Sequence, residues 1–260
     1  MKLNIVPART GLVWVKLGIA TFFKQPLALA GLFFLYMAAI LLVAQIPYVG
    51  IFIGGMLVPG ATLGLMAAAA EASTGKFPMP TVLLSAFRAG RSRGRAMLIL
   101  GAIYTAGSLV ATRLAMLLAG PGAATTPGTE FDFTAIVALA LHTPLFLMFW
   151  HAPALVHWHG VPPVKSVFFS VIACLRNFGA LTIYGMLWLG IFLGAGIVFG
   201  LIGSLLGGSL MAKAVMMPTA LLLAAMFSTS IYFTFRDSFV ADASPPTGET
   251  HDTAHPERPH

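Results

Sequence analysis

Charged residues are scarce in this sequence, and acidic residues are fewer than basic ones. Only 9% of the 260 residues are Asp, Glu, Lys or Arg, against 58% that are hydrophobic. Soluble globular domains carry about 25% charged residues, so the composition excludes that class. A mean hydropathy of +0.90 indicates a protein that crosses a membrane several times.

Cysteine is almost absent, and no acidic residue interrupts the centre of an apolar segment. Cys174 is the sole cysteine, so it cannot form an intramolecular disulfide, and it lacks the CxxC or Cys/His spacing of a metal site. Without a midplane carboxylate, the chain lacks the proton relay common in ion-coupled transporters. No HExxH or Walker motif is present. We therefore predict that the chain is not an enzyme and holds no cofactor.

The 15 Lys and Arg residues give a formal net charge of +7. They are dispersed between apolar segments, which the positive-inside rule explains and which argues against a nucleic-acid partner. Lys16 and Lys24 interrupt the first apolar run, so we expect no cleavable signal peptide.

Six apolar stretches are long enough to cross a hydrocarbon core of about 30 Å. They are residues 27–46, 51–72, 96–119, 134–158, 180–207 and 214–235. This pattern predicts an all-α membrane protein with one six-span transmembrane domain over residues 1–236. The polar remainder, residues 237–260, has no hydrophobic periodicity and is predicted to be a disordered cytoplasmic tail.

Glycine pairs four residues apart mark the fifth stretch. They are Gly190/Gly194, Gly196/Gly200 and Gly203/Gly207. Such spacing allows helices to approach closely in lipid, so we expect helix contacts there.

Three amphipathic segments, residues 1–26, 80–95 and 164–176, are too basic or too short to span. We expect each to lie on the cytoplasmic membrane surface, with Trp14 near headgroup level. In the second, Leu83, Leu84 and Phe87 oppose arginines, and in the third Ser166 and Ser170 share the polar side. The residues predicted to contact anionic phospholipid headgroups are Arg88, Arg91, Arg95, Lys165 and Arg176.

Each surface segment precedes two spans, which predicts three repeats of a surface amphipathic helix plus a helical hairpin. An offset of 85 residues superposes Gly75 on Gly160 and Ser85 on Ser170. The second span of each unit contains a proline that we expect to kink it. These prolines are Pro59, Pro153 and Pro218.

Four histidines of the fourth span form a candidate polar cluster: His142, His151, His157 and His159. On an ideal helix His142 and His151 point to opposite sides, and the other two flank Trp158 where interfacial anchors are common. We favour packing or interfacial roles and predict no metal site. The alternative is a metal, haem or proton-handling role.

Several motifs carry a resemblance to a known family. They are W...FF.QPLAL near the N-terminus, SAFR, FW.AP.LV.W.G and K..FFS..AC.RN. Over residues 8–236 the chain resembles an uncharacterised family of proteobacterial six-span inner-membrane proteins. The resemblance implies a six-helix bundle in the bacterial inner membrane. Its general design is similar to that of the membrane domain attached to some glycerophosphodiester phosphodiesterases, whose catalytic domain this sequence lacks. It supplies no catalytic or binding residues.

The features that recur in the sequence are amphipathic segments suited to the membrane surface and small residues suited to helix packing. We therefore expect a non-enzymatic envelope protein that organises lipids or a membrane complex, with the lipid bilayer and another membrane protein as partners. The alternative is a carrier or channel for a small or lipid-like solute.

Reporter fusions test the predicted orientation. Lys and Arg number four before the first span, five between spans two and three, two between spans four and five and two after span six, against Arg113 and Lys213 on the other side. The positive-inside rule then places both termini in the cytoplasm. A fusion after Pro127 should report the periplasm and one after Asp237 the cytoplasm; the reverse pattern would overturn the orientation.

Overall fold

The computed structural model describes residues 2–119, 133–206 and 209–240. Within them, six helical segments are long and apolar enough to span a bilayer. They are α2 (Pro26–Ala44), α3 (Gly50–Ser73), α5 (Arg91–Ala119), α6 (Phe133–Trp150) continued by α7 (Ala152–His159), α9 (Phe178–Leu206) and α10 (Ser209–Ser238). The predicted all-α class with six spans is confirmed. Pro127, which is predicted to be periplasmic, and the part of the predicted tail beyond residue 240 lie outside the described residues.

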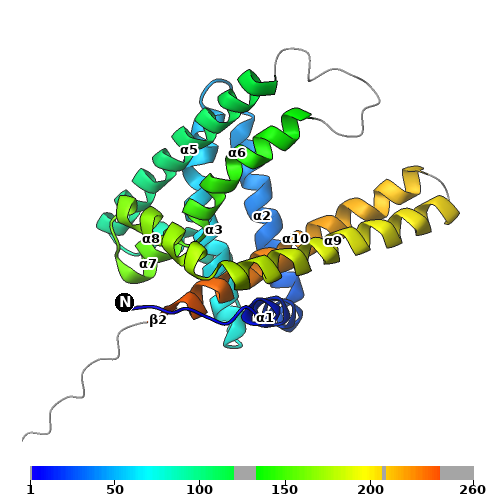
Figure 1. The fold of residues 1–260 in the computed structure, drawn as a ribbon, viewed down its shortest axis with the longest axis horizontal. Coiled ribbons are helices and arrows are strands. Elements are labelled where there is room, and N and C mark those ends of the chain that lie inside the picture. The colour runs from blue at the N-terminus through cyan, green and yellow to red at the C-terminus, as the bar shows by residue number, and fades with distance from the viewer. Residues whose placement is uncertain (1, 120–132, 207–208, 241–260) are drawn as a thin grey trace, which may run out of the picture.

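The spans form three hairpins, α2–α3, α5–α6 and α9–α10, that meet at one end of the molecule, here called the base. In Figure 1 the second and third hairpins diverge from this base and α2 and α3 lie between them. The short elements lie at the base: α1 (Thr10–Lys24), the 3-10 helix η1 (Pro80–Leu84), α4 (Ser85–Arg88) and α8 (Pro163–Arg176). A short helical element thus precedes every hairpin. The repeat itself stays a prediction.

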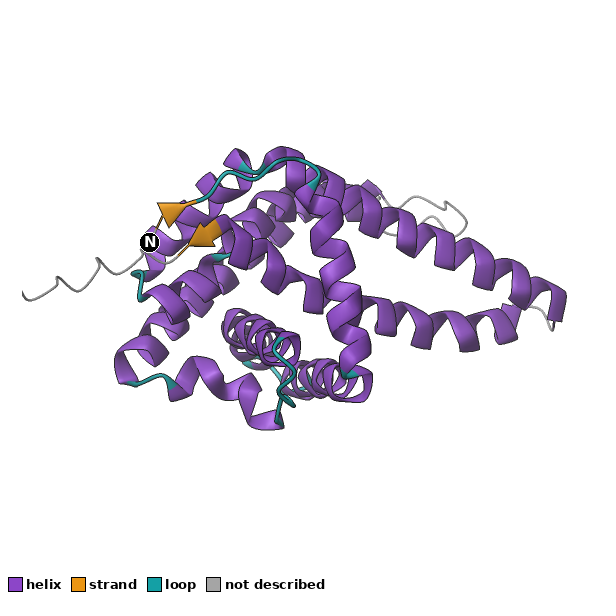
Figure 2. Cartoon of the chain, turned by 90° about the horizontal axis from the view of Figure 1, so that it is seen from below, coloured by secondary structure: helices purple, strands orange, loops and turns teal. Residues whose placement is uncertain are grey.

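Both ends of the described chain are joined at the base. β1 (Lys2–Leu3) pairs antiparallel with β2 (Phe239–Val240), and the two strands lie side by side when seen from below (Figure 2). Asn177, between α8 and α9, accepts a hydrogen bond from Val6 N–H at 2.9 Å and donates to the Asn4 carbonyl at 3.1 Å. The described fold therefore continues to Val240, past the predicted domain boundary at residue 236.

Helix α1 is a packed part of the bundle. Trp14 is fully buried, lies edge-on to Tyr184 of α9 and donates from Nε1 to Asp237 of α10 at 3.0 Å. These contacts hold Trp14 inside the bundle; its depth at headgroup level stays a prediction.

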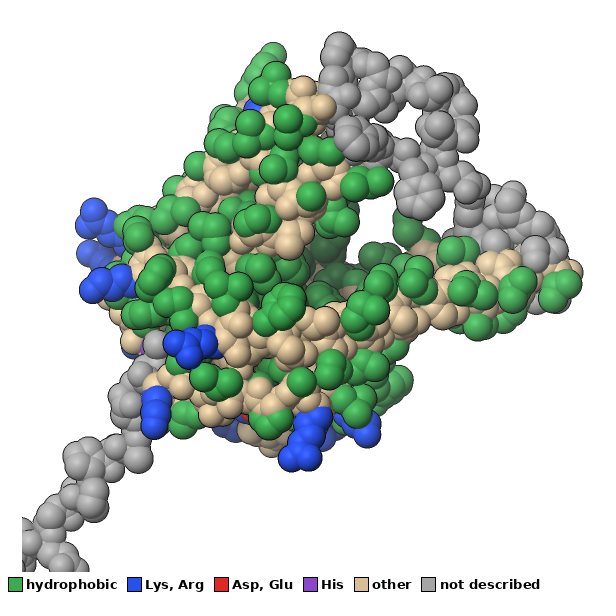
Figure 3. All heavy atoms as spheres, in the orientation of Figure 1, with side chains coloured by type: hydrophobic (Ala, Val, Ile, Leu, Met, Phe, Trp, Pro, Cys, Tyr) green, Lys and Arg blue, Asp and Glu red, His purple; other side chains and the backbone are tan. Residues whose placement is uncertain are grey.

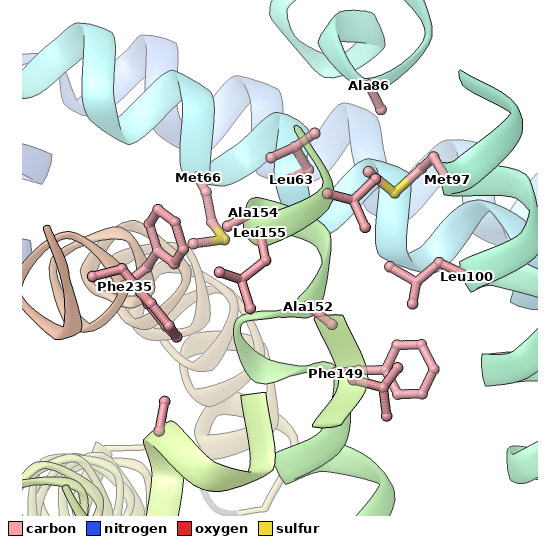
Figure 4. Packing of buried hydrophobic residues seen from close by; sticks show 14 of the residues in the cluster. Leu63, Met66, Ala86, Met97, Leu100, Phe149, Ala152, Ala154, Leu155 and Phe235 are labelled. Atoms are coloured by element: carbon pink, nitrogen blue, oxygen red, sulfur yellow. The ribbon is translucent and has the colours of Figure 1, made fainter. Parts of the chain in front are cut away.

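The largest cluster of buried apolar residues surrounds α7. Ala152, Ala154 and Leu155 are fully buried, and they lie among Met66 of α3, Leu100 of α5 and Phe235 of α10 (Figure 4). Small side chains on α7 let these larger neighbours interdigitate, as in other close-packed protein interiors.

Two of the three predicted glycine pairs make no close helix contact, and Gly207 of the third pair lies outside the described residues. A Cβ atom added at Gly190, Gly194, Gly196 or Gly200 would meet no heavy atom within 4 Å, so these residues make no close contact within the chain. By contrast, a Cβ at Gly18 would overlap the Cα and Cβ atoms of Ser230, where α1 crosses α10.

Gly18→Ala should therefore destabilise the protein. The methyl group has no space against Ser230, and overpacking of this kind costs about 1–3 kcal/mol. Gly31→Ala, on an open face of α2, is the matched control and should be neutral or slightly stabilising, since alanine is the better helix former. Thermal unfolding of both variants in the same detergent measures the difference; equal midpoints would contradict the α1–α10 contact.

Candidate functional site

A pocket of about 540 Å³ opens at the base between the C-terminal end of α3, the loop after it, η1, α4 and α7. Its volume lies in the range of roughly 300–1,000 Å³ that is typical of ligand sites. The lining residues are Glu71, Lys76, Phe77, Met79, Thr81, Val82, Ser85, Arg88, Ala89 and His157. We call this the base pocket.

A tight turn at the end of α3 positions Lys76. Gly75 has a φ of +83°, a conformation that glycine adopts without the steric cost of a side chain. The turn is closed by Lys76 N–H, which donates to the Glu71 carbonyl at 3.0 Å. Gln25, between α1 and α2, donates from Nε2 to the Lys76 carbonyl at 3.0 Å. The loop is thus fixed from two sides.

The wall formed by η1 and α4 rests directly on α3. A Cβ atom at Gly64 would lie 2.6 Å from Leu83 Cα, and one at Gly60 would lie 3.3 Å from the Phe87 ring. Glycine at both positions lets the short helical segment approach the α3 backbone. The same face of α3 therefore anchors the pocket wall.

The charged side chains of the base pocket have no partners among the described residues. Glu71, Lys76 and Arg88 line the pocket, and none of them forms a side-chain hydrogen bond or ion pair with the described part of the chain. Ser85 Oγ on α4 and His157 Nδ1 on α7 are buried at the pocket and also lack hydrogen bonds. A buried polar group without a partner costs about 1–3 kcal/mol. A ligand that forms hydrogen bonds with these groups would remove that cost.

A side chain from α8 enters the backbone hydrogen-bond ladder between α6 and α7. His151 N–H donates to Ser170 Oγ at 3.0 Å, and that hydroxyl donates to the Leu147 carbonyl at 2.8 Å. The hydroxyl thus replaces the direct bond that a continuous helix would form between residues 151 and 147. This interruption directs α7 into the core and carries His157 to the base pocket.

The three predicted kink prolines have different settings. Pro59 and Pro218 lie inside the continuous helices α3 and α10, whereas Pro153 lies in the first turn of α7, just after the interruption. Proline suits that first turn because its missing N–H has no intrahelical partner there.

The four predicted histidines have separate surroundings. His142 Nδ1 lies 2.8 Å from the Ala138 carbonyl oxygen, and His151 is buried beside the rings of Phe235 and Phe239. His157 lines the base pocket, and the ring of His159 lies 5.8 Å from that of Phe235. Among the described residues, no three His, Cys, Asp or Glu side chains are placed to share a metal ion.

The predicted basic residues are all exposed: Arg88, Arg91, Arg95, Lys165 and Arg176. They do not share one surface helix in the second unit, however. Gly90, with a φ of +105°, separates α4 from α5, so Arg91 and Arg95 belong to the first turns of the spanning helix α5. The predicted surface helix over residues 80–95 is wrong in that respect.

Helix α8 has a buried face with small polar residues, an exposed apolar face and exposed basic residues, instead of the two faces predicted. Ser166 and Ser170 are buried against the bundle, so the prediction that they share the outward polar side with Lys165 is wrong. Opposite them, Val164 and Phe168 are 70% and 61% exposed. Small polar residues meet the protein because their hydroxyls have backbone partners there. Burial raises the pKa of the Cys174 thiol on the packed side to about 12, so it stays protonated and unreactive.

Comparison with known proteins places the chain in a family. It is 39% identical over 256 residues to a protein of Burkholderia thailandensis named as a probable inner membrane protein, and the match covers 92% of this chain and 94% of that relative. The chain belongs to that inner-membrane protein family. No model of a known protein family and no solved structure matches it. The protein is thus a multi-pass inner-membrane protein, in agreement with its six apolar helices.

Sequence patterns missed most of the base pocket. Glu71 follows an apolar stretch and Lys76 precedes Pro78 and Pro80, and nothing in the local sequence brings them near His157. The available signal was the turn sequence Gly75 to Pro80, which predicts an interruption but not what lies opposite it.

Ser170→Ala tests the hydroxyl that joins α6, α7 and α8. The change leaves His151 N–H and the Leu147 carbonyl without their partner, so we expect a loss of about 1–3 kcal/mol in the free energy of unfolding. Ser166→Ala is the matched control, because Ser166 is equally buried and bonds only to Pro163 within its own helix. Denaturant titration in detergent compares them; an equal loss in both variants would contradict the bridging role.

Proposed function

We propose that this inner-membrane protein is a non-enzymatic envelope protein that binds and organises phospholipids at its base. The observation that carries the proposal is the distribution of charge. Most Lys and Arg side chains gather around the base, and hydrophobic side chains cover the diverging hairpins (Figure 3). Cytoplasmic segments of inner-membrane proteins are rich in Lys and Arg, which supports the proposal that the base and both termini lie at the cytoplasmic leaflet.

Helix α8 supports a surface role. Its outward residues Val164, Phe168 and Leu175 are exposed and apolar, and Lys165 and Arg176 are exposed beside them. A helix lying in the membrane interface has this combination, with the apolar side toward acyl chains. Each basic residue near anionic lipid contributes about 1 kcal/mol, so the five exposed basic residues together favour anionic phospholipids.

A carrier or channel is the alternative function. A pocket of about 210 Å³ between α5 and α6 is lined by Tyr104, His142 and Thr143 among apolar side chains, which gives the spanning region a polar site. The similarity in design to membrane domains of some glycerophosphodiester phosphodiesterases stays a prediction, as does a second membrane protein as partner.

Lipid analysis of the purified protein tests the proposed function. In nanodiscs prepared from a mixture of phosphatidylethanolamine and phosphatidylglycerol, the protein should enrich phosphatidylglycerol around itself. Replacing Arg91, Arg95, Lys165 and Arg176 together by Gln should remove that enrichment, since it removes the surface charges. Arg113→Gln, a change on the opposite side of the predicted topology, should not.

Two results would contradict the proposal. One is the same enrichment in the fourfold variant and the wild type at equal thermal stability. The other is solute flux through liposomes containing the pure protein, which would favour the carrier or channel.

A further inference from the structure

The base pocket differs from the surrounding surface because it contains charges of both signs. Glu71 is half-buried at its edge, and Lys76 and Arg88 are exposed to it. None of the three is neutralised within the described chain. A ligand with one sign of charge satisfies only part of this set. An anion alone is repelled by the carboxylate, and a metal cation is repelled by the ammonium and guanidinium groups.

We propose that the base pocket binds the headgroup of an aminophospholipid, with its phosphate held by Arg88 and Lys76 and its ammonium by Glu71. The proposal rests on the proposed function and names the lipid class and the site. It differs from the surface enrichment of anionic lipid, because it concerns one lipid in one pocket.

The residue types suit the two halves of such a headgroup. The planar guanidinium of Arg88 matches phosphate oxygens in a two-point hydrogen bond, and Lys76 adds a second positive charge. The Ser85 hydroxyl, buried in the same wall without a partner, has a donor to offer after a side-chain rotation. The carboxylate of Glu71 is the group that an ammonium needs. Each charge of the pocket thereby gains a partner.

Apolar groups at the pocket favour a lipid over a soluble phosphate compound. Phe77 and Met79 line the pocket and are 64% and 59% exposed. The other face of η1 and α4, with Leu84 and Phe87, lines a separate apolar groove of about 310 Å³ shared with α2 and α3. A soluble headgroup gains nothing from either surface, whereas the acyl chains of a lipid bury apolar area against them.

The pocket is fixed before any ligand binds. Gln25 holds the Lys76 carbonyl, and Gly64 holds η1 against α3. A preformed site loses less conformational freedom on binding, which suits selection of one headgroup from the excess of lipid around it.

Native mass spectrometry of the full chain tests the assignment. Protein in detergent is titrated with phosphatidylethanolamine, phosphatidylglycerol or soluble phosphoethanolamine, and the first bound molecule is counted. Wild type should retain one phosphatidylethanolamine in preference to phosphatidylglycerol. Glu71→Gln should weaken phosphatidylethanolamine roughly tenfold, the effect of losing one charge-assisted hydrogen bond, and should remove the preference. Arg88→Gln should weaken both lipids.

Matched variants separate the pocket from the surface. Arg91→Gln, an exposed charge outside the pocket, should leave the first phosphatidylethanolamine bound. Lys76→Gln replaces Arg88→Gln if the latter does not fold. Equal affinity of wild type for both lipids, or an unchanged Glu71→Gln, would overturn the proposal, and so would equal binding of soluble phosphoethanolamine. The fourfold surface variant distinguishes the two proposals. It should lose the enrichment of phosphatidylglycerol and still retain one phosphatidylethanolamine in the base pocket.

Discussion

The position of α7 depends on the hydroxyl of Ser170, which stands between the His151 N–H and the Leu147 carbonyl. In a bilayer, an open backbone hydrogen bond has no water to satisfy it, so a spanning helix can break only where another group replaces the bond. Here the replacement comes from α8, the next helix along the chain. The break between α6 and α7 and the helix α8 therefore stabilise each other. The Ser170 hydroxyl of α8 satisfies the open backbone groups at the break, and these two hydrogen bonds hold α8 against the bundle.

Small residues and single hydrogen bonds also join the helices at the base. Lipid tails are as apolar as the helix surfaces, so association in the membrane relies on close packing and hydrogen bonds instead of hydrophobic burial. Gly18 lets α1 meet Ser230, and Gly64 lets η1 meet α3. Trp14 and Asp237 join the first and last helices through one hydrogen bond. These contacts pack the helices of the base closely together, whereas apolar side chains near the far end of the α9–α10 hairpin, such as Leu205 and Met217, are exposed.

The fixed backbone of the base determines where the charged residues of the base pocket lie. Basic residues dispersed along a flexible surface attract any anionic lipid, but Lys76 and Arg88 lie with Glu71 on walls that α3 and Gln25 hold in place. Fixed charges of both signs can distinguish headgroups of equal size by the arrangement of their charge, which general attraction cannot do. In the two proposals made above, the surface selects lipids by net charge and the base pocket selects one headgroup by geometry.

The sequence by itself determined the number of spans, their approximate limits and the concentration of Lys and Arg on one side. The length of an apolar stretch and the charge of its flanks can be read from the local sequence. The thickness of the bilayer sets the first, and the positive-inside rule relates the second to topology. It did not determine which glycines are crossing points: the conspicuous pairs such as Gly190 and Gly194 face open space, whereas the isolated Gly18 is a contact. Nor did it show that Ser170 is buried, that Trp14 binds Asp237, or that Glu71, Lys76 and His157 line one pocket. Those facts depend on which helices cross and at what angle, and only the tertiary structure decides this, because in lipid many faces of an apolar helix are nearly equivalent until close packing and hydrogen bonds select one.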